Sequence, residues 1–237
     1  MKRLDLTKAG VHPDLVAKMR EWESIPAAER IALEVAPLCP HGTADPAVCP
    51  DCLTPAEQRI DPLDLMRIPP EFRDARMSDL PKLLLDKLGP YLASWPPARA
   101  FLWMGGNVGS GKTHAACAVL KHIHANRGVT GRFWGAGDVA DGWRTASASD
   151  YEGPWTAERL DNALMLAPVL VLDDVGAERA TDFTSGKFYR VIDARWREQR
   201  PTIITTNVPA DALDPRIRSR LLSGVQVTFK GQDRRIQ

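Results

Sequence analysis

Short apolar runs alternate with longer amphipathic stretches from about residue 100 onward. The apolar runs span residues 100–104 and 169–172, and a shorter one, Ile203-Ile204, lies within the threonine-rich stretch 202–207; each is followed by polar or loop-forming residues. Runs of this kind are typical of strands that are buried on both faces of a parallel sheet. Between them, residues 114–126 and 184–199 have apolar positions at helical spacing. The pattern predicts an α/β fold in which helices flank a parallel sheet.

Weaker patterns extend this prediction in both directions. Strands are expected over 130–134 and 225–229, and a helix over 82–95. Residues 13–36 also have roughly helical spacing, which Pro26 divides into two helices. This first part of the chain is either a small helical bundle or a partner-binding module, and the pattern fits both.

Three regions follow from these elements. We expect an N-terminal domain over 1–60, a linker with an entry helix over 61–98, and the main domain over 99–237.

Eight residues between the first strand and its helix carry the strongest chemical signal. Residues 106–113 read Gly-Asn-Val-Gly-Ser-Gly-Lys-Thr, which is the phosphate-binding P-loop pattern. Its glycines let successive backbone N–H groups point at phosphate oxygens. Lys112 is expected to reach the β- and γ-phosphates, and the Thr113 hydroxyl to bind Mg²⁺. The expected nucleotide-binding residues are Gly106, Asn107, Val108, Gly109, Ser110, Gly111, Lys112, Thr113 and His114.

The apolar run at 169–172 ends in two acids, Asp173 and Asp174. A buried parallel strand would deliver these carboxylates beside the P-loop. Asp173 is then expected to hold Mg²⁺, directly or through water, and Asp174 to polarise the attacking water. An ordinary acidic turn after a buried strand is the weaker alternative.

Polar residues near the C-terminus complete the candidate site. Asn207 follows the strand at 202–206 and could orient the attacking water or touch the γ-phosphate. The segment 214–221 contains Arg216, Arg218 and Arg220, and an arginine there can neutralise charge that develops during phosphoryl transfer. A helix with a solvated basic face is the alternative for Arg216 and Arg218.

Three of the four cysteines cluster near residue 50. Cys39, Cys49 and Cys52, with His41, could form a tetrahedral zinc site in an otherwise polar loop. One residue between Cys39 and His41 is an unusual spacing, so free thiols or a redox pair remain alternatives. A redox Cys-x-x-Cys would be expected at a helix start within a βαβ unit, which is missing here.

The stretch 135–165 contains Trp143, Arg144, Tyr151 and Trp155. Stacking aromatics with basic residues can hold single-stranded nucleic acid. Packing in the core is the favoured interpretation for each aromatic side chain, because large aromatics are usually well buried.

Composition and charge restrict the class of protein and its expected compartment, but they do not indicate a function. The 237 residues carry a formal net charge of +1, with 44% hydrophobic and 26% charged residues, which is ordinary for a soluble globular protein. No global basic field points to nucleic acid, so such a site must be local. The charged N-terminus lacks an apolar signal core, and no apolar run is long enough to span a bilayer. We therefore expect a cytoplasmic protein without a membrane partner.

Together these motifs resemble a known family. The P-loop, Leu-Asp-Asp-Val-Gly-Ala-Glu, Thr-Thr-Asn and Arg-Ile-Arg-Ser-Arg-Leu are similar to those of the DnaC/DnaI-type AAA+ ATPases, which load replicative helicases in bacteria and phages. Ile-Pro-Pro-Glu-Phe-Arg-Asp-Ala resembles that family's entry into its ATPase domain. The resemblance covers about residues 67–237.

The resemblance implies an ATPase that uses ATP and Mg²⁺ and loads a DnaB-type helicase onto single-stranded DNA. It gives Asn207 a sensor role and makes Arg220 the finger that enters a neighbouring subunit's site, so the protein would form a homo-oligomer on ATP binding. The N-terminal domain would grip the helicase, and some relatives carry zinc there.

Two departures qualify these expectations. Asp174 stands where many AAA+ ATPases have Glu, which favours slow turnover, although this family commonly has Asp. The chain also ends about seventeen residues after Arg220, which leaves no room for a helical lid.

Other functions remain open. An IstB-type helper ATPase of DNA transposition shares the same nucleotide motifs, and a nucleotide-gated binding protein with little hydrolysis is the alternative from another class. A small-molecule kinase fits least, because an arginine-bearing lid is missing.

Overall fold

The elements form where the apolar and amphipathic stretches lie. The structure is a computed structural model, and it describes residues 61–148, 156–176 and 181–230. The strands are β1 (Phe101–Gly106), β2 (Arg132–Gly135), β3 (Leu170–Asp173), β4 (Thr202–Thr206) and β5 (Val225–Phe229). The longer helices are α4 (Lys82–Leu92), α5 (Lys112–Arg127), α6 (Ala136–Ala146), α7 (Ala157–Leu166), α8 (Asp182–Arg197) and α9 (Pro215–Leu222). Short turns are α3 (Pro62–Leu65), η3 (Pro70–Phe72), η4 (Met77–Asp79) and η5 (Ala210–Ala212).

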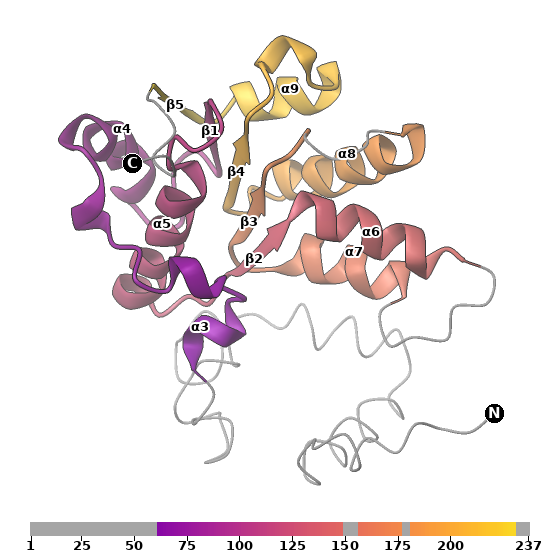
Figure 1. Cartoon of the computed structure of the whole chain (residues 1–237), viewed down its shortest axis with the longest axis horizontal. Helices are drawn as coiled ribbons and strands as arrows, with labels where there is room; N and C mark the ends of the chain where they lie inside the picture. Colours follow the sequence, from indigo (N-terminus) through magenta and orange to yellow (C-terminus); the bar gives the residue numbers. More distant parts are fainter. Residues whose placement is uncertain (1–60, 149–155, 177–180, 231–237) are drawn as a thin grey trace, which may run out of the picture. The chain divides into compact units, whose positions relative to one another are not determined.

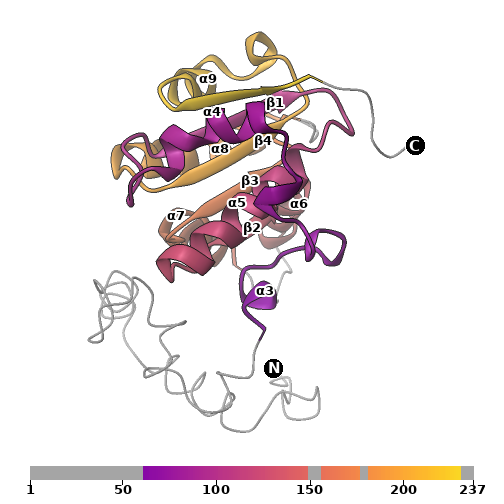
Figure 2. The ribbon, with the colours of Figure 1, turned by 90° about the vertical axis from the view of Figure 1, so that its left-hand side faces the viewer.

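The strands pair in the order β2-β3-β4-β1-β5, and every pairing is parallel. Figure 2 shows them in this order, with β5 near the top of the view and β2 below. Because parallel strands end at the same edge of a sheet, the P-loop after β1 lies at the edge where β3 and β4 also end. The predicted parallel sheet flanked by helices is confirmed.

Alternate residues of β1, β2, β3 and β4 enter two separate apolar cores. On β3, Val171 packs on one face of the sheet, whereas Leu170 and Leu172 pack on the other. One core contains residues of α4 and α5, and the other contains residues of α6, α7, α8 and α9. Figure 1 shows α4 and α5 on one side of the strands and α6, α7 and α8 on the other. The central strands are therefore covered on both sides, which explains the apolar runs in β1 and β3.

One buried arginine ties the helices of the second core to the sheet. The Arg195 side chain of α8 is fully buried and donates to the carbonyls of Leu164, Met165 and Ala167 at the end of α7. It also donates to the Pro201 carbonyl and to Thr202 Oγ1, at the start of β4. Carbonyls at a helix end have no partner within the helix, so this guanidinium satisfies groups that would otherwise be buried without hydrogen bonds.

The region between β2 and β3 differs most from expectation. It contains α6 and α7, which the apolar pattern did not predict. Trp143 of α6 is fully buried, and its Nε1 donates to Asp161 Oδ1 on α7 at 2.8 Å. Packing in the core is thus confirmed for Trp143, whereas Tyr151 and Trp155 lie outside the described residues.

The expected domain over residues 1–60 also lies outside the described part. None of the helices in the described segments has the length and apolarity needed to cross a bilayer.

Candidate functional site

The P-loop joins the end of β1 to the start of α5 and depends on glycine for its close packing. A Cβ on Gly106 would lie 2.3 Å from the carbonyl oxygen of Phe229 on β5, so no larger residue fits. Gly111 has a φ of 92° and precedes the first residue of α5. The first N–H groups of α5 therefore face the loop, which is the arrangement that binds phosphate at a helix N-terminus.

Lys112 lies inside the loop. Its Nζ donates to the carbonyls of Gly106 at 2.8 Å and Asn107 at 2.7 Å, and the side chain is buried. The Ser110 hydroxyl also donates to the Asn107 carbonyl, at 2.7 Å. These contacts hold the ammonium at the centre of the loop, where an anionic phosphate would compete with the two carbonyls for it.

The fold brings Thr113 and Asp173 together across 60 residues of sequence. Thr113 Oγ1 on α5 donates to Asp173 Oδ2 at the end of β3, at 3.1 Å. Mg²⁺ sites in nucleotide-binding proteins use one or two protein oxygens together with phosphate oxygens and water. This hydroxyl and carboxylate beside Lys112 fit such an ion.

Burial raises the pKa of Asp173 above its ordinary value, and hydroxyl donors oppose the shift. The first of these donors is Thr205 of β4, whose Oγ1 donates to Asp173 Oδ1 at 2.7 Å. Thr113 is the second. The carboxylate is thus held at both oxygens by hydroxyl groups from two different elements.

Thr205 also fixes the backbone of Asp174, the residue that follows Asp173. The backbone N–H of Asp174 donates to Thr205 Oγ1 at 2.8 Å, and that of Val175 donates to the Thr205 carbonyl at 2.9 Å. Asp174 has a φ of 61°, which is uncommon outside glycine, and its side chain is exposed. Asn207 follows β4 directly and is half-buried. Sequence reasoning identified Asp173, Asp174 and Asn207 but missed Thr205.

A cavity of about 270 Å³ opens beside the P-loop. Phe72 of η3 and Asp79 of η4 line it together with P-loop residues, and His114 Nε2 lies 3.3 Å from Asp79 Oδ2. The backbone N–H of Arg76 lowers the pKa of Asp79. Phe72 and Asp79 were not selected from the sequence, although both belong to the segment that precedes α4 and β1. The lining residues are Phe72, Asp79, Gly109, Gly111, Lys112, Thr113 and His114.

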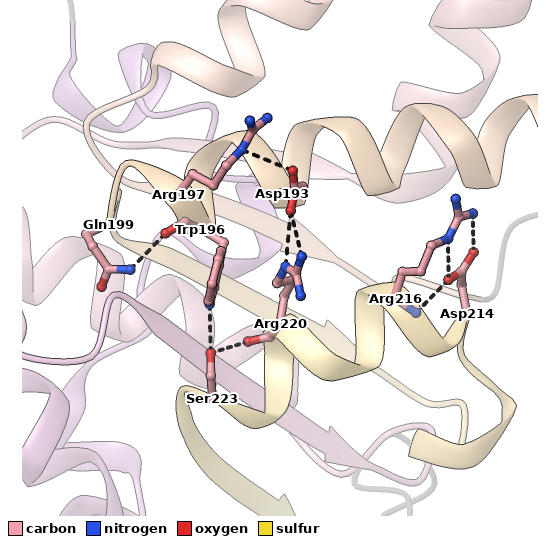
Figure 3. A network of polar contacts seen from close by, with 8 residues as sticks. All are labelled: Asp193, Trp196, Arg197, Gln199, Asp214, Arg216, Arg220 and Ser223. Carbon is pink, nitrogen blue, oxygen red and sulfur yellow. Dashed lines mark hydrogen bonds and ion pairs between the residues drawn. The ribbon is translucent and has the colours of Figure 1, made fainter.

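Arg220 lies on α9 and contacts α8. Its Nε and Nη2 are 3.1 and 3.0 Å from Asp193 Oδ1, and its guanidinium lies over the Trp196 ring (Figure 3). In this structure, the contacts of its guanidinium with described residues are all on α8. The structure therefore joins the P-loop, Thr113 and Asp173 in one place and leaves Arg220 in another.

The predicted zinc ligands, Cys39, His41, Cys49 and Cys52, lie outside the described residues. Within residues 61–148, 156–176 and 181–230, there is no group of three His, Cys, Asp or Glu side chains that could hold a metal ion. A Mg²⁺ ion at Thr113 and Asp173 needs no such group, because phosphates and water supply its other ligands.

The comparison with known protein families matches the part of the chain that contains the P-loop and Asp173. The family model of IstB-like ATP binding proteins matches residues 72–222, which is more than half of the chain. No curated protein matches the sequence.

Solved structures with the same fold include proteins of DNA replication. The chain is similar to a DnaC helicase loader, with a TM-score of 0.59 and 23% identity over 68% of this chain and 100% of that one. It is also similar to DnaI, with a TM-score of 0.57 and 22% identity over 70% and 96% of the two chains. AMPPCP-bound DnaA from Aquifex aeolicus gives a TM-score of 0.57 and 19% identity over 67% of this chain and 50% of its own.

Proposed function

The chain belongs to the family of IstB-like ATP-binding proteins, and from that premise we propose that it is an ATPase of the AAA+ type that loads a replicative helicase onto single-stranded DNA. The observation that supports hydrolysis best is the contact between Thr113 and Asp173, 3.1 Å apart at the end of β3 and beside Lys112. A hydroxyl and a carboxylate in this position suit a Mg²⁺·ATP substrate.

In this proposal each residue has a defined task. The P-loop N–H groups and Lys112 bind the phosphates, and Thr113 and Asp173 hold Mg²⁺. When bound, the ion neutralises negative charge on the phosphate oxygens. Asp174 polarises the attacking water, and Asn207 orients it. Because Asp174 is exposed and Asp173 is partly buried, the two carboxylates have different environments suited to different tasks.

Assembly completes the site. Arg220 contacts α8 of its own subunit, and we assign it to the nucleotide of a neighbouring subunit, where it would stabilise the transferred phosphoryl group. The active form is then a homo-oligomer that depends on ATP, and the isolated chain turns over slowly.

The helicase is assigned to the N-terminal domain, where Cys39, His41, Cys49 and Cys52 would hold a structural zinc ion. The fold shared with the DnaC helicase loader, over all of that chain, supports a helicase as the partner, and the resemblance of the sequence motifs supports the N-terminal domain as its contact. The family description favours a second function, the helper ATPase of a transposase, because it names IstB-like proteins.

One experiment separates these functions. The purified protein with ATP is mixed either with the host's hexameric helicase and circular single-stranded DNA or with a transposase and duplex DNA. A loader forms a stable complex with the helicase and transfers it to the DNA circle. Binding to the transposase and duplex DNA alone would instead establish the helper function. ATP turnover that stays low with each set of partners would favour a nucleotide-gated binding protein.

A further inference from the structure

Asp193 joins Arg220 to a second arginine. Asp193 Oδ1 accepts hydrogen bonds from Arg220, while Asp193 Oδ2 lies 3.1 Å from Nε of Arg197, one turn further along α8 (Figure 3). The Asp193 side chain is 15% exposed and that of Arg220 is 26% exposed, so solvent screens this pair less than an ordinary surface pair. One carboxylate between two guanidinium groups leaves the cluster with a net positive charge.

Trp196 fixes the plane of the same guanidinium. Arg220 Cζ lies 4.4 Å from the centre of the Trp196 ring, a stacking distance for a cation on an aromatic face. The ring is itself held, because Trp196 Nε1 donates to Ser223 Oγ at 2.9 Å. Ser223 Oγ in turn donates to the Arg220 carbonyl at 2.7 Å. The contacts form a closed loop between α8 and the end of α9.

Arg216, on the same helix, is held differently. It lies over Tyr189 at 4.5 Å, but its acid is Asp214, the N-cap of its own helix. Its side chain is 57% exposed, compared with 26% for Arg220. Arg216 can therefore keep its acid partner when α9 moves relative to α8, whereas Arg220 cannot.

From these contacts we propose that Asp193 and Trp196 are positioning residues for Arg220. They bind its Nε edge and its flat face, and so fix the direction of the guanidinium before a neighbouring subunit arrives. An unrestrained arginine loses much rotamer freedom when it is ordered, which weakens its action on a partner's phosphate. The inference rests on the proposed role of Arg220 in a neighbouring site.

Mixed oligomers test the inference and the role of Arg220 separately. Arg220→Ala subunits keep an intact P-loop but supply no arginine. Lys112→Ala subunits supply Arg220 but bind no nucleotide. Neither alone should hydrolyse ATP, and mixing them should restore turnover. The decisive measurement repeats this mixing with Lys112→Ala subunits that also carry Asp193→Ala or Trp196→Ala.

We expect the Asp193→Ala and Trp196→Ala versions to restore a rate roughly tenfold lower than that of the Lys112→Ala subunit, a size set by the cost of ordering an arginine side chain. The matched control is Arg197→Ala in the same Lys112→Ala background. It removes a partner of Asp193 that does not contact Arg220, and it should restore the full rate.

The outcomes are distinct. Equal restoration by the Asp193→Ala and unmodified Lys112→Ala subunits would overturn the positioning role and leave the role of Arg220 intact. No restoration by the unmodified Lys112→Ala subunit would reject the role of Arg220, and the positioning role with it. Melting temperature and sedimentation of each mixture exclude unfolding or failed assembly. Where Asp193→Ala does not fold, Asp193→Asn keeps the shape and an acceptor oxygen, and its restored rate should still fall.

Discussion

Thr205 Oγ1 lies 2.7 Å from Asp173 Oδ1 and joins two strands at the point where the candidate chemistry takes place. The same oxygen accepts the N–H of Asp174 at 2.8 Å. One buried hydroxyl therefore orients the proposed Mg²⁺ ligand and also fixes the backbone of the residue that would polarise water.

Thr205→Val should lower ATP turnover roughly tenfold, because the variant loses a hydrogen bond to a charged group worth about 1.5 kcal/mol. Nucleotide affinity without Mg²⁺ should change little, since Thr205 does not line the P-loop cavity. Steady-state kinetics and a nucleotide titration measure the two effects. Thr205→Ser keeps the hydroxyl and serves as the control, with nearly normal turnover. Equal turnover in the Val and Ser variants would contradict the role of the hydroxyl.

Asp173→Asn should stabilise the nucleotide-free protein at neutral pH while abolishing Mg²⁺-dependent turnover. The pKa of Asp173 is raised in the folded state, so the ionised carboxylate lowers stability at neutral pH. As pH falls through this raised pKa, the folded state takes up the proton first and the cost disappears. Urea unfolding at several pH values should show that the variant has a larger free energy of unfolding than the wild type, and that this difference becomes smaller toward acid pH. A variant less stable than the wild type at neutral pH would refute this account.

Lys112→Ala should abolish measurable ATP binding, because no other described side chain places an ammonium inside the loop. Isothermal titration with a non-hydrolysable analogue is the measurement. Lys121→Ala, nine residues further along α5, is the matched control and should bind normally. Normal affinity in the Lys112 variant would remove the phosphate-binding assignment.

Arg195→Met should destabilise the protein by about 3–5 kcal/mol, because several buried carbonyl groups lose their donor at once. Arg200→Met is the control. Arg200 is 27% exposed and pairs with Glu198, so its loss should cost less than about 1 kcal/mol. Chemical denaturation of both variants decides the matter. Similar losses for the two variants would show that the buried contacts of Arg195 have no special weight.

Metal analysis of the full chain should find about one zinc ion per chain, bound by Cys39, His41, Cys49 and Cys52. The double variant Cys49→Ser/Cys52→Ser should lose the metal. Cys117→Ser should keep it, because that thiol is buried on α5 in the apolar core. A folded wild-type protein without zinc would exclude the site.

Most of the sheet could be predicted because strands that are buried on both faces have continuous apolar runs. Such runs can be recognised in the sequence without knowing which strands pair. The predicted final strand, 225–229, agrees with β5. In contrast, α6 contains Gly137, Gly142 and two aspartates, which disfavour a helix. Its stability comes from packing of Val139, Ala140 and Trp143 in the core, and packing cannot be read from local propensity.

The candidate site likewise has one part that could be predicted from the sequence and one part that could not. The P-loop is a continuous segment, so its sequence alone specifies it. Thr205, Phe72 and Asp79 join the site only through strand pairing and through the path of the chain before α4. Nothing local distinguishes Thr205 from Thr202 or Thr206, which are also buried on β4. The contact between Arg220 and Asp193 likewise depends on how two helices pack.

The close approach of Gly106 to β5 has a consequence for how movements are transmitted within the protein. The first glycine of the phosphate loop rests against the carbonyl of Phe229, and the strand ending there follows directly from the helix that carries Arg220. A displacement of that helix by an adjoining subunit would thus be transmitted along β5 to the backbone that cradles the nucleotide. Contact with the adjoining subunit and nucleotide binding in the phosphate loop would then influence each other, with β5 as one of the elements that connect them.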